Sequence, residues 1–166
     1  MRKLLVLYSL LFFVFSCKDQ EDTGANETDK PVAEFTFKSM PVDVELSDAA
    51  REELKNWKTY DAFENSFAVF KKSRNTEDLK LAVADLLEKE ARWAKDTFPE
   101  PYDNNQIKSR QTILRNFLLK TKGYLEMQED VKEPIKEVLV ARNALRNHFN
   151  RIARDTIDIK LLLNGE

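Results

Sequence analysis

From Ser47 onward, large apolar residues recur every three or four positions between charged ones, which is the spacing of one face of an α-helix. The first stretch predicts a helix that Ser47 caps and that ends near Ser73. Its apolar face consists of Ala50, Leu54, Trp57, Phe63, Phe67 and Phe70. A second helix is predicted to begin after Asn75 or Thr76 and to stop before Pro99. Its apolar face consists of Leu79, Val83, Leu86, Leu87, Ala91, Ala94 and Phe98.

A third helix is predicted after Asp103, which has the spacing of a capping box with Gln106. Its apolar face consists of Ile107, Leu114, Phe117, Leu118, Thr121 and Leu125. Glycine costs about 1 kcal/mol inside a helix. The helix therefore either ends at Gly123 or runs on to about Gln128.

The fourth helix has the most regular pattern. Asp130 and Glu133 mark its start, and Pro134 sits just inside it. Its apolar face follows alternating steps of three and four, the pattern of a heptad seam, and consists of Ile135, Val138, Arg142, Leu145, Phe149, Ile152, Thr156, Ile159 and Leu163. We expect a length of roughly 43 Å for about 29 residues.

Four amphipathic helices joined by short links favour antiparallel neighbours. The sequence therefore predicts an all-α domain, an up-down antiparallel four-helix bundle over residues 47–166. Residues 31–46 read as an extended segment that packs on the domain, because Phe35 and Phe37 alternate with polar residues. Aromatic residues at helical spacing are core residues far more often than ligand contacts, so we assign them to the core.

The N-terminus has a different pattern. Arg2 and Lys3 precede an apolar run from residue 4 to residue 15, which is too short to span a bilayer. Val14, Ser16 and Cys17 follow in the order aliphatic, small and cysteine. This arrangement resembles the export signal of bacterial lipoproteins, although an aromatic residue stands at position 15, where a small or β-branched one is usual.

The resemblance covers about residues 1–22 and concerns the protein's location, not its activity. It implies that residues 1–16 are a cleaved signal peptide and that Cys17 carries acyl chains that anchor the protein to a membrane. Residues 17–30 are rich in acids and lack large apolar residues, so they read as a solvated tether. The acids directly after Lys18 resemble the signal that sends some lipoproteins to the outer cell surface. We therefore expect an outer-membrane lipoprotein of the cell envelope, with its domain on either side of that membrane.

Composition excludes several kinds of site. The net charge of the chain is −2, and removing the two basic residues of the leader makes the mature chain −4, so no nucleic-acid partner is expected. One cysteine and one histidine are too few for the usual zinc or di-iron ligand sets. No glycine-rich phosphate loop or nucleophile-elbow motif is present in the sequence. We predict a protein without cofactor and without catalytic residues.

Two enzymatic or cofactor-dependent alternatives stay open. His148, at the border of the apolar face of the fourth helix, could ligate a haem in a cofactor-carrying bundle. Paired carboxylates could serve a hydrolase of envelope polymers, since such pairs leave no spacing signature in the sequence. Asp61, Glu64 and Asp85 lie near apolar stripes, but as acids on helix flanks they read mainly as solvated side chains.

Charge is distributed unevenly along the chain. Residues 31–103 carry 16 acids and 11 bases, a net of −5, whereas residues 104–154 carry 5 acids and 11 bases, a net of +6. Folding the third and fourth helices into a hairpin brings their acid-free runs together. The candidate anion- or partner-binding residues are Lys108, Arg110, Arg115, Arg142, Arg146, Arg151 and Arg154.

Two interpretations of these basic residues compete. In one, the basic hairpin is neutralised by the acidic first helices inside the fold. In the other, it presents an anion-binding face, since the arginine fork bonds two oxygens of one group at once. The sequence thus predicts a lipid-anchored, non-catalytic binding or accessory module. Its expected partners are an envelope protein, an anionic glycan or an anionic glycolipid.

Overall fold

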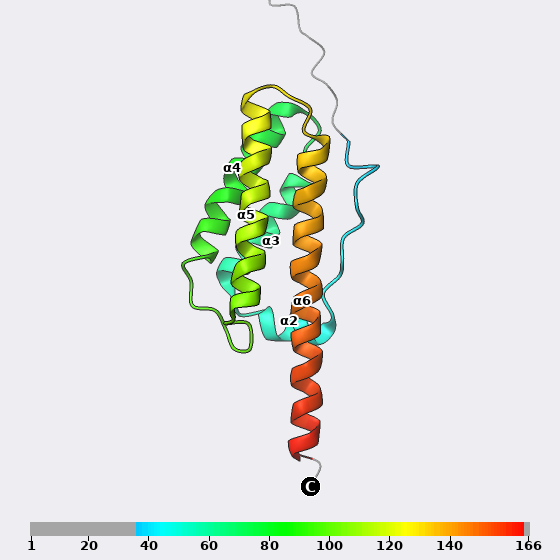
Figure 1. Cartoon of the computed structure of the whole chain (residues 1–166), viewed down its shortest axis with the longest axis vertical. Helices are drawn as coiled ribbons and strands as arrows, with labels where there is room; N and C mark the ends of the chain where they lie inside the picture. Colours follow the sequence, from blue (N-terminus) through cyan, green and yellow to red (C-terminus); the bar gives the residue numbers. More distant parts are fainter. Residues whose placement is uncertain (1–35, 165–166) are drawn as a thin grey trace, which may run out of the picture. The chain divides into compact units, whose positions relative to one another are not determined.

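The computed structural model describes residues 36–164 (Figure 1), and this part of the chain is all-α, with five helices and no strand. The helices are α2 (Asp48–Leu54), α3 (Lys58–Phe70), α4 (Thr76–Trp93), α5 (Asn105–Glu126) and α6 (Lys132–Asn164). Consecutive helices from α3 to α6 pack against each other, and α2 packs on α6. The predicted leader, Cys17 and the tether lie outside the described residues, as does Phe35.

The prediction of one continuous helix between Ser47 and Ser73 is wrong. The chain forms two helices there, α2 and α3, with a turn at residues 55–57 between them. Four buried residues, Leu54, Trp57, Tyr60 and Phe63, follow each other at steps of three. A helix turns 300° over three residues, so three such steps would put Leu54 and Phe63 on opposite sides of one helix. The turn resets the helical phase and lets all four side chains face the core.

The end of α4 also differs from the prediction. The helix stops at Trp93, and Phe98 is buried in the loop that follows it. Trp93 and Phe98 are five positions apart, which is about 140° around a helix, so one helix cannot bury both rings on the same face. By leaving the helix, the chain packs Phe98 against Trp57, with 4.7 Å between ring centroids. Ala94, predicted to be apolar-facing, is exposed.

Helix ends follow ordinary capping chemistry. The side chains of Ser47 and Asn75 accept hydrogen bonds from the first turns of α2 and α4, which confirms both predicted caps. The predicted capping box at Asp103 is wrong, because the neighbouring Asn104 accepts from the backbone N–H of Ile107. Asn104 alone therefore fixes the start of α5.

Helix α5 runs through Gly123 and ends at Glu126, which supports the longer of the two predicted lengths. Gln128 adopts a left-handed φ of 58°. The backbone N–H groups of Gln128 and Glu129 then donate to the carbonyls of Leu125 and Tyr124. These two bonds form the Schellman arrangement that satisfies the last carbonyls of a helix.

The core lies between the helices and is dense in aromatic rings. Tyr60 of α3 and Trp57 at the N-cap of that helix pack on Trp93 of α4 and Phe149 of α6 at centroid distances between 5.3 and 6.4 Å. Ring pairs of this kind contribute roughly 0.5–1.5 kcal/mol each beyond the burial of their area. Most residues of the predicted apolar faces are buried, so the helical periodicity identified the core correctly.

Residues 36–46, here called the strap, form no helix or strand and run along α6. The side-chain amide of Asn143 accepts from the N–H of Val44 at 2.9 Å and donates to the carbonyl of Val42 at 2.8 Å. Seven residues further along α6, Asn150 bonds the carbonyl of Glu45 and the N–H of Ser47 in the same way. Two amides one heptad apart thus hold an extended backbone that has no strand partner.

Helix α6 is the longest element, and its last turns continue beyond the other helices (Figure 1). It starts at Lys132, whose N–H donates to the side chain of Asp130, close to the predicted start. Within residues 36–164, no helix combines the length and the apolar character needed to cross a bilayer.

Candidate functional site

Two of the predicted anion-binding arginines, Arg142 and Arg146, form ion pairs within the fold. The guanidinium of Arg142 donates to both oxygens of Glu64, at 3.2 and 2.5 Å, and Arg146 donates to the same carboxylate at 2.9 Å. Asp43 of the strap lies 3.3 Å from Arg142 and 2.8 Å from Lys71. We call these five residues the Glu64 cluster. It joins α3, α6 and the strap.

The Glu64 cluster is largely shielded from water. The side chains of Arg142 and Arg146 are only 6% and 12% exposed, and that of Glu64 is 15% exposed. Arg142 also stacks over the ring of Phe67, 4.2 Å from its centroid. The pKa of Asp43 is lowered: burial opposes ionisation, but Lys71 and Arg142 together outweigh it. Glu64 is therefore the partner of two buried arginines rather than a solvated flank.

The other two acids singled out in the sequence have local partners. Asp61 is exposed and accepts a hydrogen bond from the side chain of Asn65 at 3.1 Å. Asp85 accepts from the hydroxyl of Ser66 and pairs with Lys89 at 3.4 Å. Both acids are therefore engaged by neighbours on α3 and α4.

Three more of the predicted basic residues point to different places. Arg115 pairs with Glu90, whose side chain is 1% exposed. Lys108 bonds Asp103 at 2.5 Å and lies over the ring of Phe98. Arg154 is 70% exposed near Asp155. The structure therefore does not gather all seven candidates on one face.

The last two predicted basic residues, Arg110 of α5 and Arg151 of α6, both act on His148 through their charges. Arg151 donates to the amide oxygen of Gln106 at 3.2 Å and to Nδ1 of His148 at 2.7 Å. Among the described residues, neither Arg110 nor Arg151 has a carboxylate within ion-pair distance. We call Gln106, Arg110, His148 and Arg151 the basic pair site.

The protonation state of His148 reflects the positive charges of the nearby arginines. A guanidinium carries no acceptor, so Nδ1 of His148 must accept from Arg151, and the imidazole is neutral. Its pKa is lowered, first by burial and then by the charges of Arg151 and Arg110. His148 is thus a buried residue that contacts Arg151 and also feels the charge of Arg110, consistent with a local excess of positive charge.

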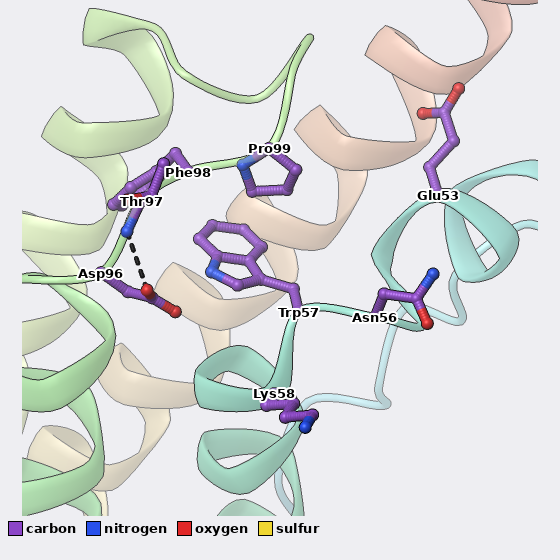
Figure 2. A pocket seen from close by; sticks show the side chains of 8 residues that line it. All are labelled: Glu53, Asn56, Trp57, Lys58, Asp96, Thr97, Phe98 and Pro99. Carbon is purple, nitrogen blue, oxygen red and sulfur yellow. Dashed lines mark hydrogen bonds between the residues drawn. The ribbon is translucent and has the colours of Figure 1, made fainter.

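A cavity of about 330 Å³ lies where the turn between α2 and α3 meets the loop after α4. In Figure 2 the indole of Trp57 forms part of its wall, and the labelled side chains of Asp96 and Glu53 lie to the left and right of it. Asp96 accepts from the hydroxyl of Thr59 and from the backbone N–H of Thr97, and these bonds lower its pKa. Glu53 accepts from the phenol of Tyr102 at 2.6 Å.

Each of these two carboxylates is held by its own neighbours. The bonds to Asp96 favour its charged form, and burial raises the pKa of Tyr102, so this phenol stays a donor to Glu53. In the part of the chain that is described, no group of three or more His, Cys, Asp or Glu side chains could hold a metal ion.

No protein-family model, curated protein or solved structure matches this chain. Its function is therefore inferred from its own geometry. The sequence did not predict that Asn143 and Asn150 hold the strap or that Gln106 bonds Arg151. The heptad spacing of the two asparagines, which marks one side of a helix, is the signal that could have identified them. At the basic pair site, two guanidinium groups have no carboxylate within ion-pair distance among the described residues, unlike the other five predicted basic residues.

Proposed function

We propose that this protein is a lipid-anchored, non-catalytic binding module of the cell envelope that recognises an anionic group at the basic pair site. The observation that carries the proposal is the pair of arginines, Arg110 and Arg151, whose charges both act on His148 and which have no carboxylate partner among the described residues. The expected partners are an anionic glycan, an anionic glycolipid or an acidic surface of an envelope protein.

Arginine chemistry supports this choice. A guanidinium presents a planar set of donors that fits a phosphate, sulfate or carboxylate group, and two of them facing one point give both charge and orientation. Gln106 already orients Arg151, which reduces the side-chain entropy lost on binding. The remaining predicted cations, Lys108 and Arg154, are exposed and would add a general attraction.

The anchor is proposed from the signal that residues 1–22 resemble. Two or three acyl chains on Cys17 would hold the protein on a bilayer, since each buried methylene contributes about 0.8 kcal/mol. We propose the outer membrane as the site of attachment. Mass spectrometry of the protein from bacterial membranes should find a mature N-terminus at Cys17 with added acyl mass. A chain that starts at Met1, or an unmodified cysteine, would refute the anchor.

The binding proposal is tested with a soluble polyanion. Dextran sulfate should bind the purified full chain in 0.15 M salt, and uncharged dextran should not. Reversing both charges, Arg110→Glu with Arg151→Glu, should weaken binding by at least about tenfold, which corresponds to 1.4 kcal/mol. The control is Arg74→Glu, an exposed cation in the turn before α4, where a change below about threefold is expected. Equal losses in both variants would refute a defined site.

His148 provides an independent readout because it is the single histidine of the chain. A bound anion offsets the charges of Arg110 and Arg151, so dextran sulfate should raise the pKa of the imidazole, measured by NMR titration. A pKa that does not move while the polyanion is bound would place the anion elsewhere and contradict the proposal.

We also propose that α3, α4, α5 and α6 form the antiparallel up-down four-helix bundle that the sequence suggests. Contacts between consecutive helices support this arrangement, as do the contacts of Glu64 and Tyr60 of α3 with Arg142 and Phe149 of α6, which would close the ring of helices. Helix α2 and the strap would then cover one flank of α6.

A further inference from the structure

Two side-chain hydrogen bonds fix how α5 and α6 face each other on the outside of the fold. Arg151 of α6 donates to Gln106 of α5 at 3.2 Å, and Lys120 of α5 donates to Glu137 of α6 at 2.7 Å. The second bond lies as far forward along α5 from the first as it lies back along α6. The two helices are therefore antiparallel neighbours with a constant register between these bonds (Figure 1). We call the line of side chains between the two bonds the α5–α6 seam.

Apolar side chains occupy the middle of the α5–α6 seam. Counting inward from both bonds places Ile113 opposite Ala144 and Phe117 opposite Val140, and steps of three and four keep them on the side of the bonded residues. Ile113 is 45% exposed and Val140 is 52% exposed, while Phe117 and Ala144 are half-buried. Single exposed aliphatic residues are normal on a protein surface, but here two pairs of apolar residues adjoin across the seam. The seam thus presents an apolar stretch to solvent.

Positive charge without an acidic partner lies at one end of this stretch. Arg110 stands one turn before Ile113, and Arg151 lies at the bond that closes the seam. Neither arginine has a carboxylate within ion-pair distance among the described residues, because the acids that flank them in sequence, Asp103 and Asp155, each pair with another cation. The bond at the other end of the seam joins two opposite charges. The seam is therefore positive at one end, apolar in the middle and neutral at the other end.

An anionic lipid surface fits this order of groups. A soluble glycan would use the arginines but would leave the apolar stretch in water. A bilayer surface offers phosphate groups and, directly beneath them, acyl chains, so it can meet cations and aliphatic side chains on the same side of a helix pair. An open, elongated surface also suits a bilayer better than a small molecule, which binds in a concave site.

The strap runs beside this surface. Asn143, one turn after Val140, donates to the carbonyl of Val42, a residue that is 87% exposed. Upstream of the strap the chain leads to Cys17, the proposed site of acylation. Residues 18–35 can span at most about 60 Å, so an anchored domain stays within reach of the bilayer. A contact that is weak in solution becomes effective at the high local concentration that such a tether gives.

We infer that the α5–α6 seam docks the domain on the anionic headgroups of the membrane to which the protein is anchored, with Ile113 and Val140 at headgroup depth. The inference rests on the proposed function, because Arg110 and Arg151 of the basic pair site bind the phosphate groups. It goes further by naming their partner, a lipid surface, and by adding the apolar stretch to the site.

The test uses the full chain, purified from bacterial membranes and placed in nanodiscs of phosphatidylcholine alone or of an equal mixture with phosphatidylglycerol. A trace lipid with a gadolinium chelate on its headgroup broadens the NMR signals of methyl groups near the membrane. The methyl signals of Ile113, Val140 and Ala144 should broaden in the anionic nanodiscs and not in the neutral ones. Those of Leu81, an aliphatic residue of α4 that is 74% exposed, should stay sharp in both.

Two double variants separate the charged and apolar parts of the seam, with the methyl group of Ala144 as the readout. Arg110→Glu with Arg151→Glu should lower the docking equilibrium at least about tenfold, since one arginine at an anionic surface contributes about fivefold. Ile113→Ser with Val140→Ser should lower it at least about fivefold, because less apolar surface leaves water on docking. This second variant should bind dextran sulfate as the unchanged chain does.

Leu81→Ser is the matched control and should change neither docking nor dextran sulfate binding. Broadening that is equal in the two kinds of nanodisc, or that survives the loss of both seam aliphatics, would overturn the inference. If dextran sulfate binds at the basic pair site while the seam methyl groups ignore anionic lipid, the partner is a free glycan or an acidic protein and only the lipid contact is refuted. If dextran sulfate does not bind either, the proposed function is refuted as well.

Discussion

Arg142 and Arg154 both lie on α6, yet their surroundings give them different roles. Arg142 meets Glu64, Asp43 and the ring of Phe67, and its side chain is 6% exposed. Arg154 lies three turns further along and is 70% exposed. A buried charge is stable only with partners, whereas an exposed one is solvated by water. The role of each arginine thus depends on what packs beside it.

Removing the acid of this cluster should be costly. Glu64→Gln leaves Arg142 and Arg146 with Asp43 as the only carboxylate of the cluster. Breaking a buried pair costs about 3–5 kcal/mol, and the partial exposure of Glu64 places the expected loss near the lower end, about 3 kcal/mol. Urea unfolding measures it. Glu88→Gln, which breaks the exposed pair with Arg92, should cost less than about 0.5 kcal/mol. Similar losses in both variants would contradict the structural role of Glu64.

His148 should make stability depend on pH near neutrality. Its pKa is lowered in the folded protein, so the unfolded chain takes up a proton at a higher pH than the folded one. The free energy of unfolding should therefore be highest above the ordinary histidine pKa of 6.5 and fall as the pH decreases through the folded pKa. His148→Gln should flatten this dependence between pH 7.5 and 5.5, measured by urea unfolding at each pH. An equally steep dependence in the variant would show that another group is responsible.

At the scale of elements, the spacing of large side chains decided where helices end. Both departures from the predicted helices occur where consecutive core residues fall out of phase, at Leu54 to Phe63 and at Trp93 to Phe98. Burial of an aromatic side chain contributes about 1.5–3 kcal/mol, which exceeds the cost of ending a helix early. Packing in the core therefore prevailed over the local preference for helix.

Helix α5 does not end at its poor helix former but continues through Gly123. A Cβ added at this position meets no atom within 4 Å, and the residue lies inside α5. Gly123→Ala should therefore raise the free energy of unfolding by about 1 kcal/mol, measured by thermal or urea unfolding. Ala84→Gly, at an exposed position in α4, should lower it by a similar amount. A loss of stability in Gly123→Ala would show that α5 needs flexibility there.

At the scale of the whole molecule, the strap connects the helices to the part of the chain that leads to Cys17. Its backbone is held by Asn143, Arg146 and Asn150 of α6, and its Asp43 enters the Glu64 cluster. The strap is therefore held to the longest helix by several side-chain-to-backbone bonds.

Hydrogen exchange can measure how tightly the strap is held. Asn143→Ala removes the acceptor of the Val44 amide, and Asn150→Ala removes that of the Ser47 amide. Each change should accelerate exchange of its own amide roughly fivefold, since one hydrogen bond contributes about 1 kcal/mol. Asn116→Ala, at an exposed position of α5, should alter neither amide. Unchanged rates would show that the amides do not hold the strap.

The sequence alone determined the all-α class, most of the core and, apart from the end of α4, the approximate helix boundaries after residue 75. It could do so because the period of apolar residues, capping side chains and prolines act over a few neighbouring positions. It also identified the uneven distribution of charge between the two halves of the chain. These properties depend on local order along the chain and are therefore visible without a fold.

Only the tertiary structure decided which basic residues are paired with carboxylates. Glu64 and Arg142 are 78 positions apart, and Asn143 lies 99 positions from the amide it bonds. Interactions over such separations depend on how the helices pack, and no local pattern records them. The same packing buried Tyr60 beside Arg146 and left Arg110 and Arg151 together at His148. The candidate sites of this protein thus depend on long-range packing, whereas its helices depend on local sequence patterns.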